Sequence, residues 1–205
     1  MSNIDSIINS SPDVSQFAKG YFEYISKLTA QLDTEAISAF VKELESARKD
    51  HNTVFFVGNG GSAATASHMA NDLAFGSRVH QDPPFRVLSL TDNVAAMTAV
   101  ANDNGYESLF IRQLKVHYRP GDKLVAISAS GNSPNVVTAA EWVKEQGGKV
   151  IGLVGFDGGK LRDICDITIC IETPKGEYGP VEDVHMMLDH LIYTWIWYRK
   201  RKGDI

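Results

Sequence analysis

Two glycine- and serine-rich segments carry the first chemical signal in this sequence. Residues 58–64 (GNGGSAA) and residues 128–134 (SASGNSP) each follow an apolar run and open a helical pattern. Glycines let the backbone turn tightly, and the free amides at a helix start favour an anion. The first segment matches neither Walker A nor GxGxxG, so no nucleotide is implied. Either segment alone could be a turn or a helix cap, but together they predict a phosphorylated small molecule held by hydroxyls and amides.

A histidine and an aspartate follow the first of these segments at helical spacing. His68 and Asp72 are four residues apart in an expected helix, so their side chains share one face. Such a pair can chelate a metal ion, and a solvated polar pair is the alternative interpretation. The sequence therefore places a candidate metal-chelating pair one turn beyond the first glycine- and serine-rich segment.

The expected C-terminal helix carries further titratable residues. Glu182 and His190 are eight residues apart, which is about 12 Å along a helix axis. Both can reach one metal only if Glu182 lies in the turn before the helix or bends toward the site. His185 and Asp189 form a second pair at a spacing of four, which we expect to be a hydrogen bond on the helix surface.

Strand-like apolar runs alternate with helical stretches through the middle of the chain. Runs rich in β-branched and aromatic residues occur at residues 53–57, 86–90, 123–127, 150–154 and 167–171. Helical stretches lie between them at residues 63–75, 94–101 and 135–146. This alternation predicts an α/β three-layer sandwich with a five-stranded parallel sheet. Both serine-bearing segments then fall at the carboxyl ends of strands, where open α/β sheets bind ligands.

Helices flank this core at both ends of the chain. We expect a single domain over residues 1–205, with N-terminal helices (1–50), an α/β core (51–172) and a long C-terminal helix (180–202). The N-terminal helices carry more apolar surface than one small sheet can cover. This surplus favours packing between subunits.

The composition limits the class of protein. A formal net charge of −5 argues against nucleic acid or an anionic membrane as a partner. No apolar run approaches the roughly 20 residues that cross a bilayer, and the first residues lack the pattern of a secretory signal. Cys165 and Cys170 would point to opposite faces of a strand, so we expect reduced thiols. These features predict a cytoplasmic enzyme or binding protein.

Four motifs together resemble the phosphoheptose isomerase family of the sugar isomerase (SIS) fold. They are GNGGSAATASH, AVANDNGYE, ISASGNSPNVV and VEDVHMMLDH, and the resemblance covers the whole chain. It implies a flavodoxin-like sheet and a homotetramer with active sites completed across subunit boundaries. The implied reaction is the aldose–ketose isomerisation of sedoheptulose 7-phosphate to D-glycero-D-manno-heptose 7-phosphate, through a metal-stabilised enediol.

The resemblance also implies roles for individual residues. One zinc ion per subunit would be held by His68, Asp72, Glu182 and His190. Asp72 would take the proton from carbon, and His190 would serve the oxygen side. Substrate contacts are implied for Asn59, Gly60, Gly61, Ser62, Asn102, Asp103, Ser128, Ala129, Ser130, Ser133 and Glu182. The chain departs from the family at three positions, where Ala129 replaces a hydroxyl residue, Asp72 a glutamate and Glu182 a glutamine.

Two other functions are compatible with the same motifs. A non-catalytic SIS module that senses sugar phosphates or binds a replication initiator would not need His68, Asp72 and His190 together. The departures at Asp72 and Glu182 keep this alternative open. An isomerase for a different sugar phosphate would retain every residue named above, because the sequence does not distinguish sugar length or stereochemistry.

Overall fold

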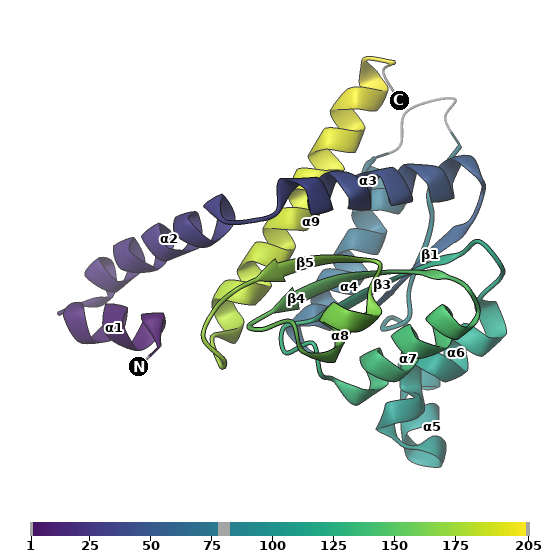
Figure 1. Cartoon of the computed structure of the whole chain (residues 1–205), viewed down its shortest axis with the longest axis horizontal. Coiled ribbons are helices and arrows are strands. Elements are labelled where there is room, and N and C mark those ends of the chain that lie inside the picture. The colour runs from purple at the N-terminus through teal and green to yellow at the C-terminus, as the bar shows by residue number, and fades with distance from the viewer. Residues whose placement is uncertain (1, 78–82, 204–205) are drawn as a thin grey trace.

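A five-stranded sheet forms the centre of the computed structural model, which describes residues 2–77 and 83–203 (Figure 1). All strands run parallel, in the order β2-β1-β3-β4-β5. Their bounds are β1 (Thr53–Val57), β2 (Arg86–Ser89), β3 (Lys123–Ser128), β4 (Lys149–Gly155) and β5 (Ile167–Ile171). Each agrees with an expected run to within one residue at either end, so the predicted parallel sheet is confirmed.

Helices precede, connect and follow the strands in the described residues. Their bounds are α1 (Asn3–Ser10), α2 (Val14–Ala30), α3 (Thr34–Lys49), α4 (Gly61–Asn71), α5 (Val94–Asn104), α6 (Leu109–His117), α7 (Pro134–Glu145), α8 (Gly159–Ile164) and α9 (Tyr178–Arg201). α4 continues directly into a π-helical turn, η1 (Asp72–Gly76), and a 3₁₀ turn, η2 (Tyr106–Ser108), precedes α6. None of the helices in the described residues has the length and apolarity needed to cross a bilayer.

The buried side chains of the strands divide between two hydrophobic clusters, one on each face of the sheet. In β1, Val54 and Phe56 belong to one cluster, and Phe55 and Val57 belong to the other. Helices α3, α4 and α9 contribute to the first cluster, and α6, α7 and α8 to the second. This alternation is the period of two that a β-strand imposes, and it confirms the three-layer sandwich.

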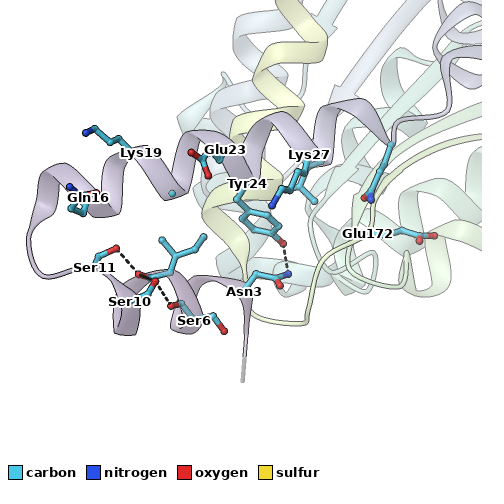
Figure 2. A pocket seen from close by; sticks show the side chains of 14 residues that line it. Asn3, Ser6, Ser10, Ser11, Gln16, Lys19, Glu23, Tyr24, Lys27 and Glu172 are labelled. Carbon is cyan, nitrogen blue, oxygen red and sulfur yellow. Dashed lines mark hydrogen bonds between the residues drawn. The ribbon is translucent and has the colours of Figure 1, made fainter.

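The two N-terminal helices extend away from the sheet, and a polar network holds them to the segment before α9 (Figure 1). Glu177 is buried and accepts hydrogen bonds from the Asn3 N–H (2.6 Å) and the Tyr24 hydroxyl (2.5 Å). Figure 2 shows Asn3 and Tyr24 in the pocket between α1 and α2, where their side chains are hydrogen-bonded at 2.9 Å. Burial, with the bond to Glu177, raises the pKa of Tyr24 to about 12. Val14 and Phe22 of α2 are 80% and 70% exposed.

The sheet places the two predicted ligand segments side by side. β1 and β3 are neighbours, and Val57 pairs with Ala126 at their carboxyl ends. Residues 58–60 lead from β1 into α4, and residues 129–133 lead from β3 into α7. α9 packs along α4. Both segments therefore lie at the carboxyl ends of neighbouring strands. α4 runs from the first of these segments along the C-terminal helix.

Candidate active site

Three serine hydroxyls converge at the carboxyl end of β3. Ser128 Oγ lies 3.1 Å from Ser133 Oγ and 3.5 Å from Ser130 Oγ. Ser133 immediately precedes α7, and its hydroxyl meets the Ser128 hydroxyl without making a capping hydrogen bond, so the first amides of α7 remain available to an anion. The backbone of Ala129 is tied to β4, because its carbonyl accepts the Gly155 N–H at 2.9 Å. We refer to residues 128–133 as the serine cradle.

The glycine turn, residues 58–62, lies beside this cradle at the end of β1. Gly60 adopts a φ of +53°, which favours glycine, and it occupies the N-cap position of α4. A side chain on Gly58 would collide with the Ser62 carbonyl, since an added Cβ would lie 2.5 Å from that oxygen. Ser62 is buried inside the first turn of the helix, because α4 already begins at Gly61.

A pair of asparagines fastens the glycine turn to the serine cradle. The side-chain amides of Asn59 and Asn135 exchange two hydrogen bonds, each 2.9 Å long. The Tyr106 hydroxyl donates to the same Asn59 oxygen at 2.9 Å. Asn102 and Asp103 lie shortly before Tyr106 on α5, where they are exposed and hydrogen-bond to each other at 2.8 Å. Sequence reasoning missed Asn135 and Tyr106, whose roles depend on contacts between distant segments.

Two histidines and two aspartates converge where α4 and its π-helical turn meet α9. One possible ligand atom from each lies within 4.8 Å of the others, in a group we call the His–Asp cluster: His68, Asp72, Asp189 and His190. His68 Nε2 lies 3.1 Å from His190 Nε2. The same His68 nitrogen lies 3.6 Å from Asp72 Oδ2 and 3.7 Å from Asp189 Oδ2. The structure therefore brings together His68, Asp72 and His190, as predicted, and adds Asp189.

Asp189 forms the buried end of this cluster. It is 1% exposed, and its Oδ2 has no hydrogen-bond donor among the described residues. Burial and the nearby Asp72 carboxylate raise the pKa of Asp189 to about 7. The His68 side chain is 42% exposed and His190 is also exposed, so the histidine side opens to solvent. The arrangement offers two imidazoles and two carboxylates to one point that solvent can reach.

The prediction of a surface hydrogen bond between His185 and Asp189 is wrong. Both side chains are buried, and within the described part of the chain no hydrogen bond joins them. His185 Nε2 lies 3.3 Å from the Val154 carbonyl oxygen, and burial lowers the pKa of His185 to about 4. Both residues are buried because they share the inward stripe of α9 with Leu188 and Ile192, which packs against the sheet.

Comparison with known proteins shows the family of this chain. Residues 17–155 match the SIS domain family. A phosphoheptose isomerase from Rhodospirillum rubrum is 45% identical over 139 residues, which is 68% of this chain and 72% of that protein. One from Aneurinibacillus thermoaerophilus is 39% identical over 171 residues, 83% of this chain and 80% of the relative. The chain belongs to the phosphoheptose isomerase family. The resemblance drawn from the four motifs is thereby confirmed.

A solved phosphoheptose isomerase shares the architecture of this family member. The structure of the enzyme from Neisseria gonorrhoeae superimposes with a TM-score of 0.79 at 27% identity, covering 90% of this chain and 98% of that one. The long C-terminal helix and the parallel sheet are therefore features of the family fold. Family membership also places the chain among sugar-phosphate isomerases.

In this chain, Glu182 lies away from the His–Asp cluster. Its carboxylate packs on Gly61, where an added Cβ would overlap it. α9 begins at Tyr178, so Glu182 is inside the helix and about 12 Å of axial rise separates it from His190. Burial, with a contribution from the Asp183 charge, raises the pKa of Glu182. Within one chain the structure therefore places Glu182 beside the glycine turn.

Proposed function

We propose that this chain is an aldose–ketose isomerase that converts sedoheptulose 7-phosphate to D-glycero-D-manno-heptose 7-phosphate. The observation that carries the proposal is that α4 begins in the glycine turn and ends in the His–Asp cluster. Ser62 and His68 are six residues apart, about 9 Å along the helix axis. An extended chain advances about 1.2 Å per bond, so the eight bonds from C1 to phosphorus span about 10 Å. A phosphate in the serine cradle would leave C1 and C2 near the cluster.

The cluster offers groups for both proton transfers of this reaction. Moving a carbonyl between C2 and C1 requires a base for the carbon-bound proton and a group that exchanges the hydroxyl proton. We assign the carbon-bound proton to Asp72, so that an enediol forms, and the hydroxyl proton to His190. His190 is exposed at the open side of the cluster, where a sugar can enter.

The residues of the cluster also fit a divalent metal ion. Imidazole nitrogens bind zinc at about 2.0–2.1 Å, which sets two tetrahedral ligands about 3.4 Å apart. The 3.1 Å between the Nε2 atoms of His68 and His190 is close to that separation. We propose that His68, Asp72 and His190 hold one zinc ion per subunit. When bound, zinc would supply Lewis-acid stabilisation for the oxygen atoms that gain charge.

We also propose that the chain forms a tetramer. A groove of about 1320 Å³ lies between α3 and α9, and His190 lines it together with Leu191, Trp195 and Tyr198. These last three side chains are 50%, 52% and 53% exposed. A second copy seated in this groove would cover apolar surface and enclose the cluster beside it. Trp195→Glu should lower the sedimentation coefficient, whereas a wild-type monomer at micromolar concentration would contradict the assembly.

A cytoplasmic location is part of the same proposal. Cys165 and Cys170 are free thiols, as is usual in reducing compartments. Burial raises the pKa of Cys165 to about 12, so this thiol stays protonated and unreactive.

A crystal grown with sedoheptulose 7-phosphate tests the proposed binding mode. The phosphate is expected on the hydroxyls of Ser128, Ser130 and Ser133, with C1 and C2 beside His190. Phosphate density found only at the basic C-terminal end of α9 would contradict the proposal.

A further inference from the structure

We infer that Asp189 is a metal ligand and that it takes the place which the family resemblance implies for Glu182. The inference rests on the proposed metal-dependent isomerase. Asp189 is 1% exposed, and its Oδ2 finds no hydrogen-bond donor in the described part of the chain. A buried carboxylate is costly unless a cation or a donor compensates it. The unpartnered oxygen faces the cluster, 3.7 Å from His68 Nε2.

The groups around Asp189 are those expected of a cation site. The described residues give it no ion pair with lysine or arginine, and its neighbours in the cluster are His68, Asp72 and His190. Carboxylates bind metal ions in their deprotonated form, and two such groups at one point would bring two negative charges that a single divalent ion neutralises. Two imidazole nitrogens and two carboxylate oxygens are a donor set that zinc accepts in four-coordinate sites.

The register of the two helices explains why Glu182 does not fill this position. α4 and α9 lie side by side, with Glu182 packed on Gly61 at one level and His190 against His68 at another. The two levels are seven residues apart on α4 and eight on α9, which is about 10–12 Å. Asp189 adjoins His190 and therefore lies at the level of the cluster. Glu182 lies at the level of the glycine turn, where it would meet the sugar chain.

Zinc titration of the purified, metal-stripped protein tests this assignment. Asp189→Asn keeps the shape of the side chain and should weaken zinc binding at least about 100-fold. Loss of a residue that only hydrogen-bonds to a metal ligand costs less, about 10- to 100-fold in metal affinity. Glu182→Gln is the matched control on the same helix, and its Kd for zinc should stay within about threefold of wild type. Cobalt(II) loading adds a spectroscopic readout, because the visible absorption of the wild-type site should change in Asp189→Asn and persist in Glu182→Gln.

Thermal unfolding in the presence of a chelator shows whether Asp189→Asn still folds. Removing a buried, uncompensated carboxylate should leave the metal-free variant at least as stable as metal-free wild type. Zinc should then raise the Tm of wild type more than that of the variant, because a ligand stabilises the state that binds it. If metal-free Asp189→Asn does not fold, Asp189→Leu takes its place in the zinc titration, because leucine removes the charge and fills the same buried space.

The outcomes separate this inference from the proposed function. Normal zinc binding by Asp189→Asn, with loss in Glu182→Gln, would overturn the assignment while leaving the isomerase intact. Wild-type protein that binds no zinc but isomerises sedoheptulose 7-phosphate would reject the metal site and this inference together. Wild type that binds zinc but isomerises no sugar phosphate would reject the proposed function, and the ligand assignment would still be decided by the two variants.

Discussion

Asn59 and Asn135 exchange two side-chain hydrogen bonds, each 2.9 Å long, between the glycine turn and the first turn of α7. Asn135 is 1% exposed, so neither bond can readily be replaced by water. The glycine turn and the serine cradle follow different strands, and this pair couples them into one unit. We therefore expect the geometry of the anion site to depend on Asn135, which need not touch the substrate itself.

Replacing Asn135 with leucine should damage substrate binding and stability together. The half-buried Asn59 amide would lose both of its hydrogen bonds to Asn135, which costs about 1–3 kcal/mol of unfolding free energy. KM for the sugar phosphate should rise at least about tenfold, because the two halves of the site are no longer fixed to each other. Steady-state kinetics and urea unfolding measure both effects. Thr138→Val on the same helix is the control, and an unchanged KM in Asn135→Leu would refute this role.

A negative charge in the serine cradle should repel a phosphate. Ser133→Asp places a carboxylate beside the Ser128 hydroxyl, where like charges brought together cost several kcal/mol. The Ki of inorganic phosphate as a competitive inhibitor should increase at least about 100-fold. Ser26→Asp on the exposed face of α2 is the matched control. Equal Ki values for wild type and Ser133→Asp would place the phosphate elsewhere.

Removing either proposed proton-transfer group should affect turnover more than binding. Asp72→Asn and His190→Asn should each lower kcat by about 10²-fold or more, the range for losing a general acid or base. KM should change little, because the serine cradle still anchors the phosphate. The zinc content of each variant must be measured as well, since both residues lie in the His–Asp cluster. A variant with near wild-type kcat would show that its assigned role is wrong.

The sheet and the places of the glycine and serine segments at its strand ends could be predicted because their signals are local. Short β-branched runs mark each strand, and the glycine and serine segments follow two strands that prove to be neighbours. The pairing of Asn59 with Asn135 could not be predicted, because it joins residues 76 positions apart. The π-helical turn that carries Asp72 was also missed, since a regular helical period does not reveal a local change in winding.

The sequence contains a signal for the burial of His185 and Asp189, which their spacing alone does not reveal. Val181, Leu188 and Ile192 recur on one face of α9 at helical spacing, and both polar residues fall on that same face. Judging the pair by its spacing of four alone suggested a surface hydrogen bond. The apolar neighbours on the stripe indicate burial, and they explain why Asp189 faces the cluster.

The buried histidine should make folding sensitive to mild acid. Burial lowers the folded-state pKa of His185 to about 4, below the unfolded value of about 6.5. Between these values the unfolded chain binds more protons, so stability falls as pH decreases from about 6.5 toward 4, by about 1.4 kcal/mol per pH unit. His185→Met should lose less unfolding free energy than wild type between pH 7 and 5, by about 2 kcal/mol.

Urea unfolding at the two pH values checks this expectation. His117→Gln removes an exposed histidine at the end of α6 and should keep the wild-type pH dependence. An identical loss of unfolding free energy in wild type and His185→Met would show that His185 does not cause the acid sensitivity.

Proton transfer between C1 and C2 of a phosphorylated seven-carbon sugar can be followed by proton NMR of sedoheptulose 7-phosphate in D₂O with the zinc-loaded wild-type protein. We expect an aldose phosphate that carries deuterium at C2, formed at least about 100-fold more slowly with Asp72→Asn. If the zinc-loaded wild-type protein yields neither conversion nor exchange, the proposed isomerase is wrong and a non-catalytic sugar-phosphate-binding protein becomes the better description.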